Sequence, residues 1–367
     1  MTSPIREAFV VAEPGDPPCL VAGVPLLVRT ILVLERVGIE RLTVVGATPP
    51  ADPRIRGPLG VAPAVRPASD GTLGLVVGPG TVIDATLVRD LQARAPAGRV
   101  LELEHQGARV RVAPGALLAT NGDTPSAPRA GVLLPATAPA PVLERALLRS
   151  LENPRDGFLD RLLHRRLSRP LTRLLLRTPL SPNAVTLLGM AVGVVGGLAL
   201  GAATLGGVVA GVTCLVASGV LDCSDGELAR LRFAESRLGH WLDMAGDTVV
   251  HLAVLGGLAL RLLHGPGLPG RPILGLLGLG VLGSFAVISW SEQAEARRHR
   301  AGGWENRVLD GVLAPLSTRD WYLFVVLFAL AGRLDWLVLG AAVGAHVFWV
   351  TALVLLVRAL GRSRAAF

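Results

Sequence analysis

Hydrophobic and charged positions divide the chain into two regions of different character. No charged residue occurs from Thr178 to Leu221, whereas the apolar runs of the first 150 residues are short and are interrupted by Gly and Pro. A membrane-spanning helix requires about 20 predominantly apolar residues. The pattern therefore predicts a cytosolic N-terminal region followed by a membrane-embedded C-terminal region.

Strand and helix patterns alternate along the N-terminal region. Short apolar runs typical of buried strands are Ala8–Ala12, Arg41–Val45 and Leu73–Val77. Apolar residues at helical spacing occur in Pro25–Val37 and within Val88–Ala95. This alternation predicts a three-layer α/β domain with a mostly parallel sheet over residues 1–145.

Six membrane spans are expected in the C-terminal region. The uncharged segment is too long for one span, and Ala202–Gly207 offers a turn between two. The further expected spans are Leu238–Leu263, Pro272–Trp290, a short one within Asp320–Leu334, and Leu337–Val357. Arg residues gather in the connections on one side, which predicts a multi-pass protein of the inner (cytoplasmic) membrane with its active site and both termini on the cytoplasmic side.

Residues 146–182 are expected to form a linker and an amphipathic helix ahead of a membrane domain over residues 183–360. Within Asn153–Thr178, Arg recurs every fourth residue from Arg161 to Arg177, while Leu residues fill another face. A basic amphipathic helix of this kind typically lies in a membrane surface. The alternative is a helix that packs on another domain and exposes its Arg face to solvent.

Composition agrees with a protein that is partly embedded in a membrane. Charged residues make up 17% of the chain and hydrophobic residues 51%, whereas a soluble domain carries about 25% charged residues. Of the net charge of +8, six units belong to residues 151–367. Because this Arg surplus follows one side of the spans, we do not expect nucleic-acid binding.

All 36 basic residues are Arg, and the chain contains no Lys. This absence excludes a P-loop lysine, a Schiff-base lysine and a lysine general base. Because Arg stays protonated at any working pH, these cations bind or position other groups and do not titrate.

Four aspartates occur where the second and third expected spans approach the same side of the membrane. Asp222 and Asp225 are three residues apart, and Asp243 and Asp247 are four apart, so each pair shares one helix face. One span enters and the other leaves on this side, so the two pairs can face each other. Intramembrane acids are costly and mark functional sites.

Converging carboxylates repel one another and do not all stay ionised alone. Divalent cations that prefer oxygen ligands, with Mg²⁺ as the first choice and Mn²⁺ as the alternative, relieve this repulsion. Two such ions can hold a pyrophosphate and activate an attacking oxygen. Capping of helices or pairing with interfacial Arg would explain Asp222 or Asp225, but not Asp243 and Asp247 inside an apolar span.

Small residues and one Arg extend the aspartates into a longer motif. It consists of Asp222-x-x-Asp225-Gly226-x-x-Ala229-Arg230, eight residues, and Gly239-x-x-x-Asp243-x-x-x-Asp247. This motif resembles the signature of the CDP-alcohol phosphotransferases (CDP-alcohol phosphatidyltransferases), with all eight fixed positions at the family's spacing. Arg165–Ser168 and Leu180–Thr186 also resemble members of that family, and the resemblance covers about residues 155–360.

The resemblance implies a homodimer with six spans that moves a phosphoalcohol group from a CDP-alcohol to an acceptor hydroxyl and releases CMP. Such enzymes serve phospholipid or inositol-phosphate head-group synthesis. Carried over by position, the four aspartates bind two metal ions, and Asp247 is also the general base. The residues that hold the CDP part are then Asp222, Gly226, Ala229, Arg230 and Gly239.

Several Arg residues are candidates for binding an acceptor's phosphate. They are Arg165 and Arg166 before the first span, and Arg297, Arg298, Arg300 and Arg307 after the fourth. Each is equally explained as a charge that sets membrane topology. In the third span, His240 and His251 are expected to be packed or interfacial residues rather than ligands.

The N-terminal segments Val21–Leu27 and Gly38–Gly46 resemble MobA-like sugar-phosphate nucleotidyltransferases. The nucleotide loop of that family carries Arg and a later Lys, but the corresponding Glu13–Cys19 is short and has neither. Where the family has a metal-binding Asp, this chain has Gly78–Pro79–Gly80. We therefore expect an inactive, cytidylyltransferase-like domain with a structural or regulatory role. The combination of such a domain with a membrane domain resembles the domain organisation of enzymes of inositol-phosphate head-group synthesis.

Two other functions are compatible with parts of the sequence. A bifunctional enzyme would also make the CDP-alcohol from CTP in its N-terminal domain, against which the missing loop Arg and Lys argue. A cation transporter would use the intramembrane carboxylates, but it requires acids at the membrane midplane and leaves Gly226, Ala229 and Arg230 unexplained.

Overall fold

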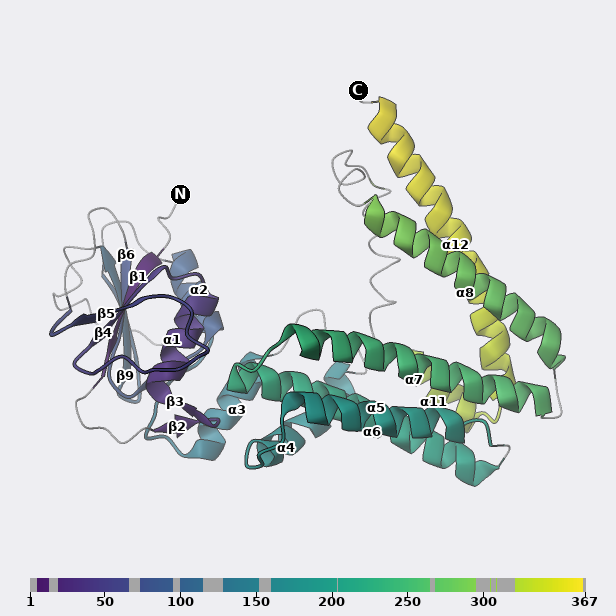
Figure 1. Cartoon of the computed structure of the whole chain (residues 1–367), viewed down its shortest axis with the longest axis horizontal. Coiled ribbons are helices and arrows are strands. Elements are labelled where there is room, and N and C mark those ends of the chain that lie inside the picture. Colours follow the sequence, from purple (N-terminus) through teal and green to yellow (C-terminus); the bar gives the residue numbers. More distant parts are fainter. Residues whose placement is uncertain are drawn as a thin grey trace. The chain divides into compact units, whose positions relative to one another are not determined.

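The computed structural model describes residues 5–12, 19–65, 73–94, 100–114, 128–151, 160–202, 204–264, 268–294, 304, 308 and 321–365 (Figure 1). The chain forms two compact units. The first comprises residues 1–153, 172–179 and 227–235, and the second comprises residues 154–171, 180–226 and 236–367.

The first unit contains a six-stranded sheet with the order β5-β4-β1-β6-β9-β8. Its strands are β1 (Ile5–Val11), β4 (Arg41–Val45), β5 (Leu59–Ala62), β6 (Leu73–Val77), β8 (Leu101–His105) and β9 (Ala108–Pro114). Neighbours from β5 to β6 pair in parallel, whereas β9 runs antiparallel to both β6 and β8. The three strands predicted from the sequence are present, but the sheet is mixed rather than mostly parallel.

A tight hairpin between β8 and β9 is the reason for the mixed sheet. Gln106 and Gly107 have φ angles of +51° and +87°, which a two-residue hairpin turn with both central residues at positive φ requires. The hairpin sends β9 back beside β6, whereas parallel neighbours need a longer crossover connection.

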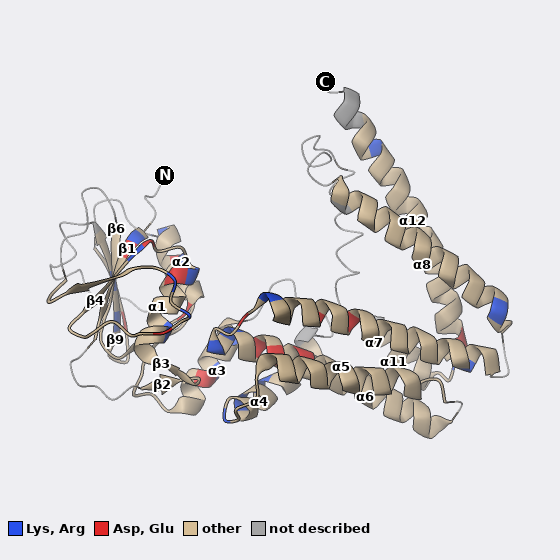
Figure 2. Cartoon of the chain, viewed as in Figure 1, with Lys and Arg blue, Asp and Glu red and all other residues tan. Residues whose placement is uncertain are grey.

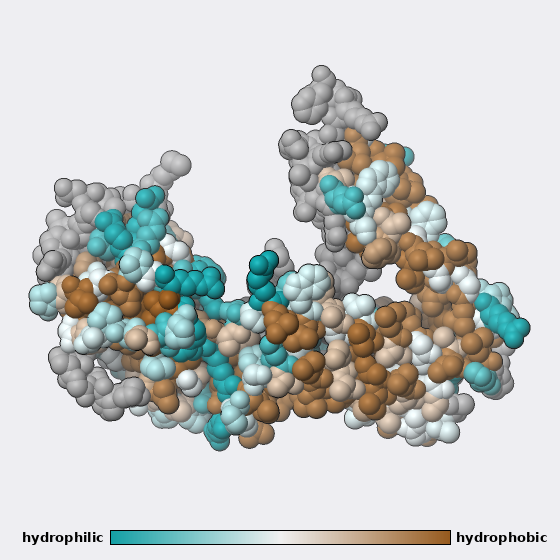
Figure 3. Space-filling view, in the orientation of Figure 1, coloured by the Kyte–Doolittle hydropathy of each residue, from teal (hydrophilic) through white to brown (hydrophobic). Residues whose placement is uncertain are grey.

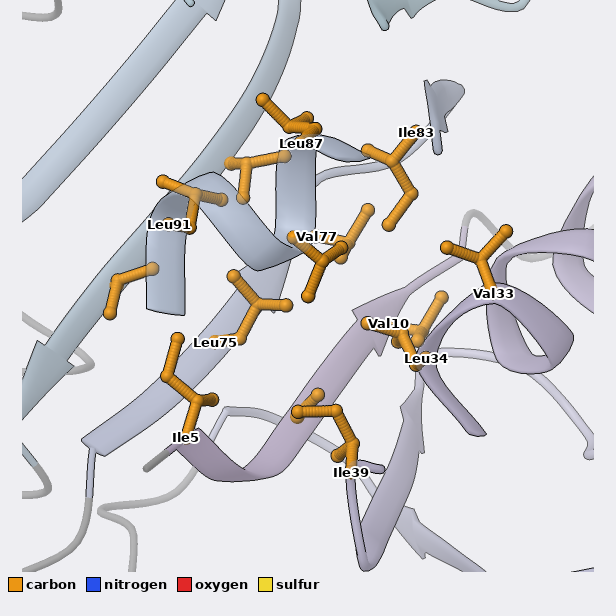
Figure 4. Packing of buried hydrophobic residues seen from close by; sticks show 14 of the residues in the cluster. Ile5, Val10, Val33, Leu34, Ile39, Leu75, Val77, Ile83, Leu87 and Leu91 are labelled. Carbon is orange, nitrogen blue, oxygen red and sulfur yellow. The ribbon is translucent and has the colours of Figure 1, made fainter. Parts of the chain in front are cut away.

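The main core lies between the sheet and two helices, α1 (Leu26–Arg36) and α2 (Ala85–Arg94). Figure 4 shows Leu34 of α1 and Leu87 and Leu91 of α2 packed with Val10 of β1 and Leu75 of β6. The opposite face carries a smaller cluster around Phe9, to which no helix contributes in the described residues. The expected third layer is therefore not seen in this part of the chain.

Smaller elements complete the first unit. They are β2 (Leu20–Val21), β3 (Val24–Pro25), β7 (Thr81–Ile83), β10 (Leu133–Pro135) and α3 (Ala140–Ser150). A second apolar cluster joins α3, through Leu143, Leu147 and Leu148, to Val21 of β2 and to Leu231.

Long helices make up the second unit. In chain order they are α5 (Pro182–Ala199), α6 (Leu205–Arg232), α7 (Arg237–His264), α8 (Gly270–Gln293), α11 (Trp321–Leu330) and α12 (Leu334–Ala365), with the last turn of α6 belonging to the first unit. Ser181 caps α5 by accepting a hydrogen bond from the Ala184 amide at 3.2 Å, and Pro182 follows at the first helical position.

Among the described residues, five helices are long and apolar enough to cross a membrane: α5, α6, α7, α8 and α12. Large apolar side chains cover much of their outer surface, shown in brown in Figure 3. The short span expected within Asp320–Leu334 corresponds to α11, which has ten residues against the roughly 20 that a span requires.

The expected amphipathic helix is present as a short π-helix (Asp160–His164) that continues into α4 (Arg165–Leu175). Its buried stripe is polar, since His164, Ser168 and Thr172 are fully buried. Leu167 and Leu174 are 45% and 60% exposed. Leu175, by contrast, is only 8% exposed. That the exposed leucines lie in a membrane surface stays a prediction.

Candidate active site

The two aspartate pairs lie on consecutive long helices of the second unit. Asp222 and Asp225 are on α6, and Asp243 and Asp247 are on α7. In Figure 2, red segments mark acidic residues on these helices, whose ribbons are otherwise mostly tan. Asp225 is buried, with 7% of its surface exposed, and the other three are half-buried.

One turn of α5 contacts both helices beside the aspartates. A Cβ atom on Gly189 would lie 3.3 Å from the Cβ of Leu221 and 3.8 Å from the amide nitrogen of Asp222. The next residue, Met190, has its Cβ 3.7 Å from the Cβ position of Gly246, which precedes Asp247. The hydroxyl of Ser218 on α6 also donates to the Gly189 carbonyl at 2.8 Å. The same turn of α5 therefore contacts α6 beside Asp222 and α7 beside Asp247.

Glycines bring the α5 and α7 backbones into direct contact further along. A Cβ on Gly257 of α7 would overlap the carbonyl oxygen of Gly197 on α5, and a Cβ on Gly197 would lie 2.6 Å from the Ala253 carbonyl carbon. Small residues at such crossings allow close helix packing inside a membrane. This contact holds α7, and with it Asp243 and Asp247, against α5.

The rest of the motif follows on the same helices. Gly226, Ala229 and Arg230 lie in the last two turns of α6. The Nε atom of Arg230 is buried and has no hydrogen-bond partner in the described part of the chain. A buried guanidinium donor left unpaired is costly, and a phosphate oxygen is a fitting acceptor for it.

Gly239 lies in the first turn of α7 and faces the start of α5. A Cβ at this position would stand 3.0 Å from the side-chain oxygen of Asn183. Asn183 therefore adds a polar group beside a motif residue. The sequence offered one indication of this position, because Asn183 directly follows Ser181 and Pro182 at the start of α5.

The donor set fits a divalent cation by its chemistry. Four carboxylates on two helices that pack on the same turn of α5 supply the hard oxygen ligands that Mg²⁺ and Mn²⁺ prefer. Within the described residues, no three His, Cys, Asp or Glu side chains are gathered closely enough to form a metal-binding group.

The acceptor-binding candidates are only partly covered by the structure. Arg165 is half-buried and Arg166 is exposed at the start of α4. Arg297, Arg298, Arg300 and Arg307 lie outside the described residues.

Both histidines of the third span lie on α7. His240 is exposed, and the Nδ1 atom of His251 lies 2.5 Å from the carbonyl oxygen of Asp247, one turn earlier in the helix. His251 is therefore engaged with the backbone of its own helix, as expected of a packed residue.

A buried acid next to the motif was not anticipated from the sequence. Glu227 is 1% exposed and accepts a hydrogen bond of 2.6 Å from the hydroxyl of Thr172 on α4. His164 packs on the same helix, since a Cβ on Gly219 of α6 would stand 2.7 Å from its ring. The buried polar stripe of α4 thus faces the motif-bearing helix.

Comparison with known proteins identifies a family and similar solved structures. Residues 179–357 match the family model of the CDP-alcohol phosphatidyltransferases. Among solved structures, the chain is similar to a phosphatidylinositol phosphate synthase from Mycobacterium tuberculosis in complex with manganese and citrate, at 25% sequence identity and a TM-score of 0.33. That similarity covers 53% of this chain and 88% of the other. The comparison with curated proteins found no match.

Proposed function

The chain belongs to the CDP-alcohol phosphatidyltransferase family through residues 179–357, and from this premise we propose that it moves a phosphoalcohol group from a CDP-alcohol to an acceptor hydroxyl and releases CMP. Membership makes it a multi-pass membrane transferase of substituted phosphate groups in phospholipid synthesis. The observation that carries the proposal is that α6 beside Asp222 and α7 beside Asp247 contact the same turn of α5.

In this proposal Arg230, Gly226, Ala229 and Gly239 hold the CDP part of the donor. Because Gly and Ala have little or no side chain, a ligand can approach the helix backbone at these positions. The guanidinium of Arg230 donates to pyrophosphate oxygens, which satisfies its buried Nε atom.

Asp247 acts as the general base. Its carboxylate takes the proton of the acceptor hydroxyl as the hydroxyl oxygen attacks the β-phosphorus, on the alcohol side of the pyrophosphate. A new P–O bond forms to the acceptor, the bond between the β-phosphorus and the bridging oxygen breaks, and CMP leaves with that electron pair.

Asp222, Asp225, Asp243 and Asp247 hold two divalent cations in this scheme, with Mg²⁺ as the first choice. When bound, such ions neutralise the negative charge that develops on the phosphate oxygens. The aspartates therefore have two roles, binding of the cations and, at Asp247, transfer of a proton.

For the N-terminal domain, covering residues 1–145, we propose a cytidylyltransferase-like fold without nucleotidyl transfer. Asp84, the first acid after β6, is 6% exposed and accepts hydrogen bonds from the amides of Leu87 and Val132 at 3.0 and 2.7 Å. Its carboxylate is thus used to cap α2 and tie down the segment before β10. Of the expected nucleotide loop, only Cys19 lies within the described residues.

The finer membrane arrangement is also a proposal. We place six spans in the inner membrane, with both termini and the active site on the cytoplasmic side and two copies forming a homodimer. The distribution of Arg along the chain supports this orientation.

A product screen tests the function. The purified full-length protein receives CDP-diacylglycerol or a CDP-polyol such as CDP-inositol, together with Mg²⁺ and a panel of free and phosphorylated alcohols that includes inositol phosphate. Mass spectrometry follows CMP and the new phosphodiester. We expect equimolar CMP and product with one donor, and no CMP from the Asp222→Asn and Asp225→Asn variants.

The same preparation separates the two alternatives. Metal flux into proteoliposomes without any CMP formation would identify a cation transporter and overturn the proposal. Release of pyrophosphate from CTP by the full chain, retained in Asp222→Asn, would identify a bifunctional enzyme.

A further inference from the structure

The carbonyl groups at the end of α6 are satisfied in an uncommon way. The last carbonyls of a helix lack partners within the helix itself. Here the Ala229 carbonyl accepts from the Ala234 amide at 2.9 Å and the Arg230 carbonyl accepts from the Phe233 amide at 3.4 Å. The next two carbonyls accept from arginine side chains of the α/β domain, Leu231 from Arg29 and Arg232 from Arg54, both at 2.9 Å.

Phe233 makes the helix end at this point. The two backbone bonds form a Schellman motif, which requires a left-handed residue and normally uses Gly there. Phe233 adopts φ +53° instead, a conformation that is unfavourable for a bulky side chain. The guanidinium groups of Arg29 and Arg36 lie 5.3 and 4.7 Å from its ring centroid. These cation–π contacts offset the strain of the backbone.

Arg29 is the central residue of this contact. It is 4% exposed and donates from Nη1 to the carbonyls of Leu231 and Val21. Burial, and secondarily the nearby Arg36, lowers the pKa of Arg29 to about 10, so it stays charged at neutral pH. A buried cation is costly, and its position at the negative end of the α6 dipole compensates part of that cost.

Two further arginines complete the contact. Asp52 binds the Arg54 guanidinium through both carboxylate oxygens, at 2.8 and 2.7 Å, and thereby directs Nη1 at the Arg232 carbonyl. Arg36 forms an ion pair with Glu235, just beyond the helix end.

We propose that Arg29, Arg36 and Arg54 are positioning residues for phosphotransfer, which hold the end of α6 so that Arg230 is oriented for the donor's pyrophosphate. Arg230 precedes Leu231 directly, so Arg29 anchors the carbonyl of the residue that follows Arg230. This inference rests on the proposed function. It gives the α/β domain a role that requires no nucleotidyl transfer.

The first test is a kinetic comparison in the full-length protein. Arg29→Met keeps an unbranched, apolar side chain but removes the donors to Leu231. We expect the KM for the CDP-alcohol to rise about tenfold, the equivalent of one buried hydrogen bond, while the KM for the acceptor stays unchanged. Arg29→Lys should recover part of this loss. Arg41→Ala, an exposed arginine of the same domain, is the matched control and should leave both constants unchanged.

A charge exchange covers the case in which Arg29→Met does not fold. Arg36→Glu and Glu235→Arg each place like charges together and should raise the donor KM about threefold. The double variant Arg36→Glu/Glu235→Arg restores the ion pair and should return the donor KM to near the wild-type value. If these residues only stabilised the fold, the single variants would lower the yield of folded protein and kcat. The double variant would then not selectively restore the donor KM.

Hydrogen–deuterium exchange separates this inference from the proposed function. Amides around residues 231–237 should exchange faster in Arg36→Glu and return to the wild-type rate in the double variant, whether or not CMP is formed. A wild-type protein without CMP release would overturn the proposed function alone. Unchanged donor KM in folded Arg29→Met, or no recovery in the double variant, would overturn the positioning role.

Discussion

Gly189 of α5 lies directly against Asp222 of α6, because a Cβ on the glycine would stand 3.8 Å from the aspartate's amide nitrogen. The following residue, Met190, contacts Gly246 beside Asp247. The first membrane helix therefore contacts α6 beside Asp222 and α7 beside Asp247, although it carries no charged residue itself. The distance between the pairs depends on how closely α6 and α7 approach this turn.

Gly189→Val should weaken metal activation more than it weakens folding. The added methyl groups meet Leu221, whose Cβ is already 3.3 Å from the Cβ position, and push Asp222 away from α7. We expect the Mg²⁺ concentration for half-maximal CMP release to rise about tenfold or more, as for changes to groups that support a metal site. Gly206→Val, at a glycine with nothing within 4 Å of its Cβ position, is the control. Equal Mg²⁺ dependence in both variants would show that the Gly189 contact does not set the position of Asp222.

Two adjacent glycines of α7 allow a matched comparison of packing. Gly257→Ala places a methyl group on the Gly197 carbonyl oxygen, whereas Gly256→Ala places one where nothing lies within 4 Å. Overpacking costs about 1–3 kcal/mol, so Gly257→Ala should lower the thermal unfolding temperature in detergent by several degrees. Gly256→Ala should leave it unchanged or raise it, because alanine favours helix. A similar effect of both substitutions would argue against direct contact of the α5 and α7 backbones.

Asp247→Asn should fold normally and release no CMP. The amide retains the shape of the side chain but cannot accept the proton of the acceptor hydroxyl. CMP formation from the donor and acceptor identified in the product screen is the measurement, with Asp335→Asn on α12 as a control that should retain activity. Normal turnover by Asp247→Asn would show that Asp247 is not the general base.

Removal of divalent cations should abolish turnover reversibly. Dialysis against EDTA should eliminate CMP release, and Mg²⁺ or Mn²⁺ should restore it, because the four carboxylates offer the oxygen ligands that both ions accept. Ca²⁺, which prefers more ligands at longer distances, should restore less. Activity that persists in EDTA would show that the aspartates work without metal.

The Asp52–Arg54 pair makes the stability of the chain depend on acidity. Hydrogen bonds from the Arg54 side chain, together with its charge, lower the pKa of Asp52 to about 2 from its usual 3.8. A lowered carboxyl pKa stabilises the fold above pH 3.8, and this contribution is lost as the pH falls toward 2. Asp52→Asn should therefore unfold at a lower temperature than wild type at pH 6, and the two curves should converge by pH 2. A constant difference in unfolding temperature between the two proteins from pH 6 to pH 2 would contradict the lowered pKa of Asp52.

Much of the secondary structure was predictable because its physical signals are local. The strands Arg41–Val45 and Leu73–Val77 and the turn between the first two spans follow from apolar runs and their interruptions. The family was predictable for the same reason, since its motif occupies consecutive positions on two helices. Binding of the acceptor's phosphate by Arg297, Arg298, Arg300 and Arg307 stays a prediction, because these residues lie outside the described part of the chain.

Other features depend on which distant residues meet. The antiparallel position of β9 follows from a hairpin whose Gln106 adopts positive φ, and nothing in its residue type requires that. The buried face of α4 includes Ser168 and Thr172, whereas Leu167 and Leu174 are exposed. Pattern analysis assigns apolar residues to a buried face, and the burial of these polar residues depends on the helix packed against them.

The sequence by itself determined the membrane character, the family motif and the chemistry of its aspartates, because charge, length and helical spacing are properties of neighbouring residues. Only the tertiary structure decided that one turn of α5 contacts both acid-bearing helices and that Arg29 binds the carbonyl of the residue after Arg230. These contacts join residues as far as 202 positions apart. They form because buried carbonyls and close-packed backbones must find partners in space, wherever those partners lie along the chain.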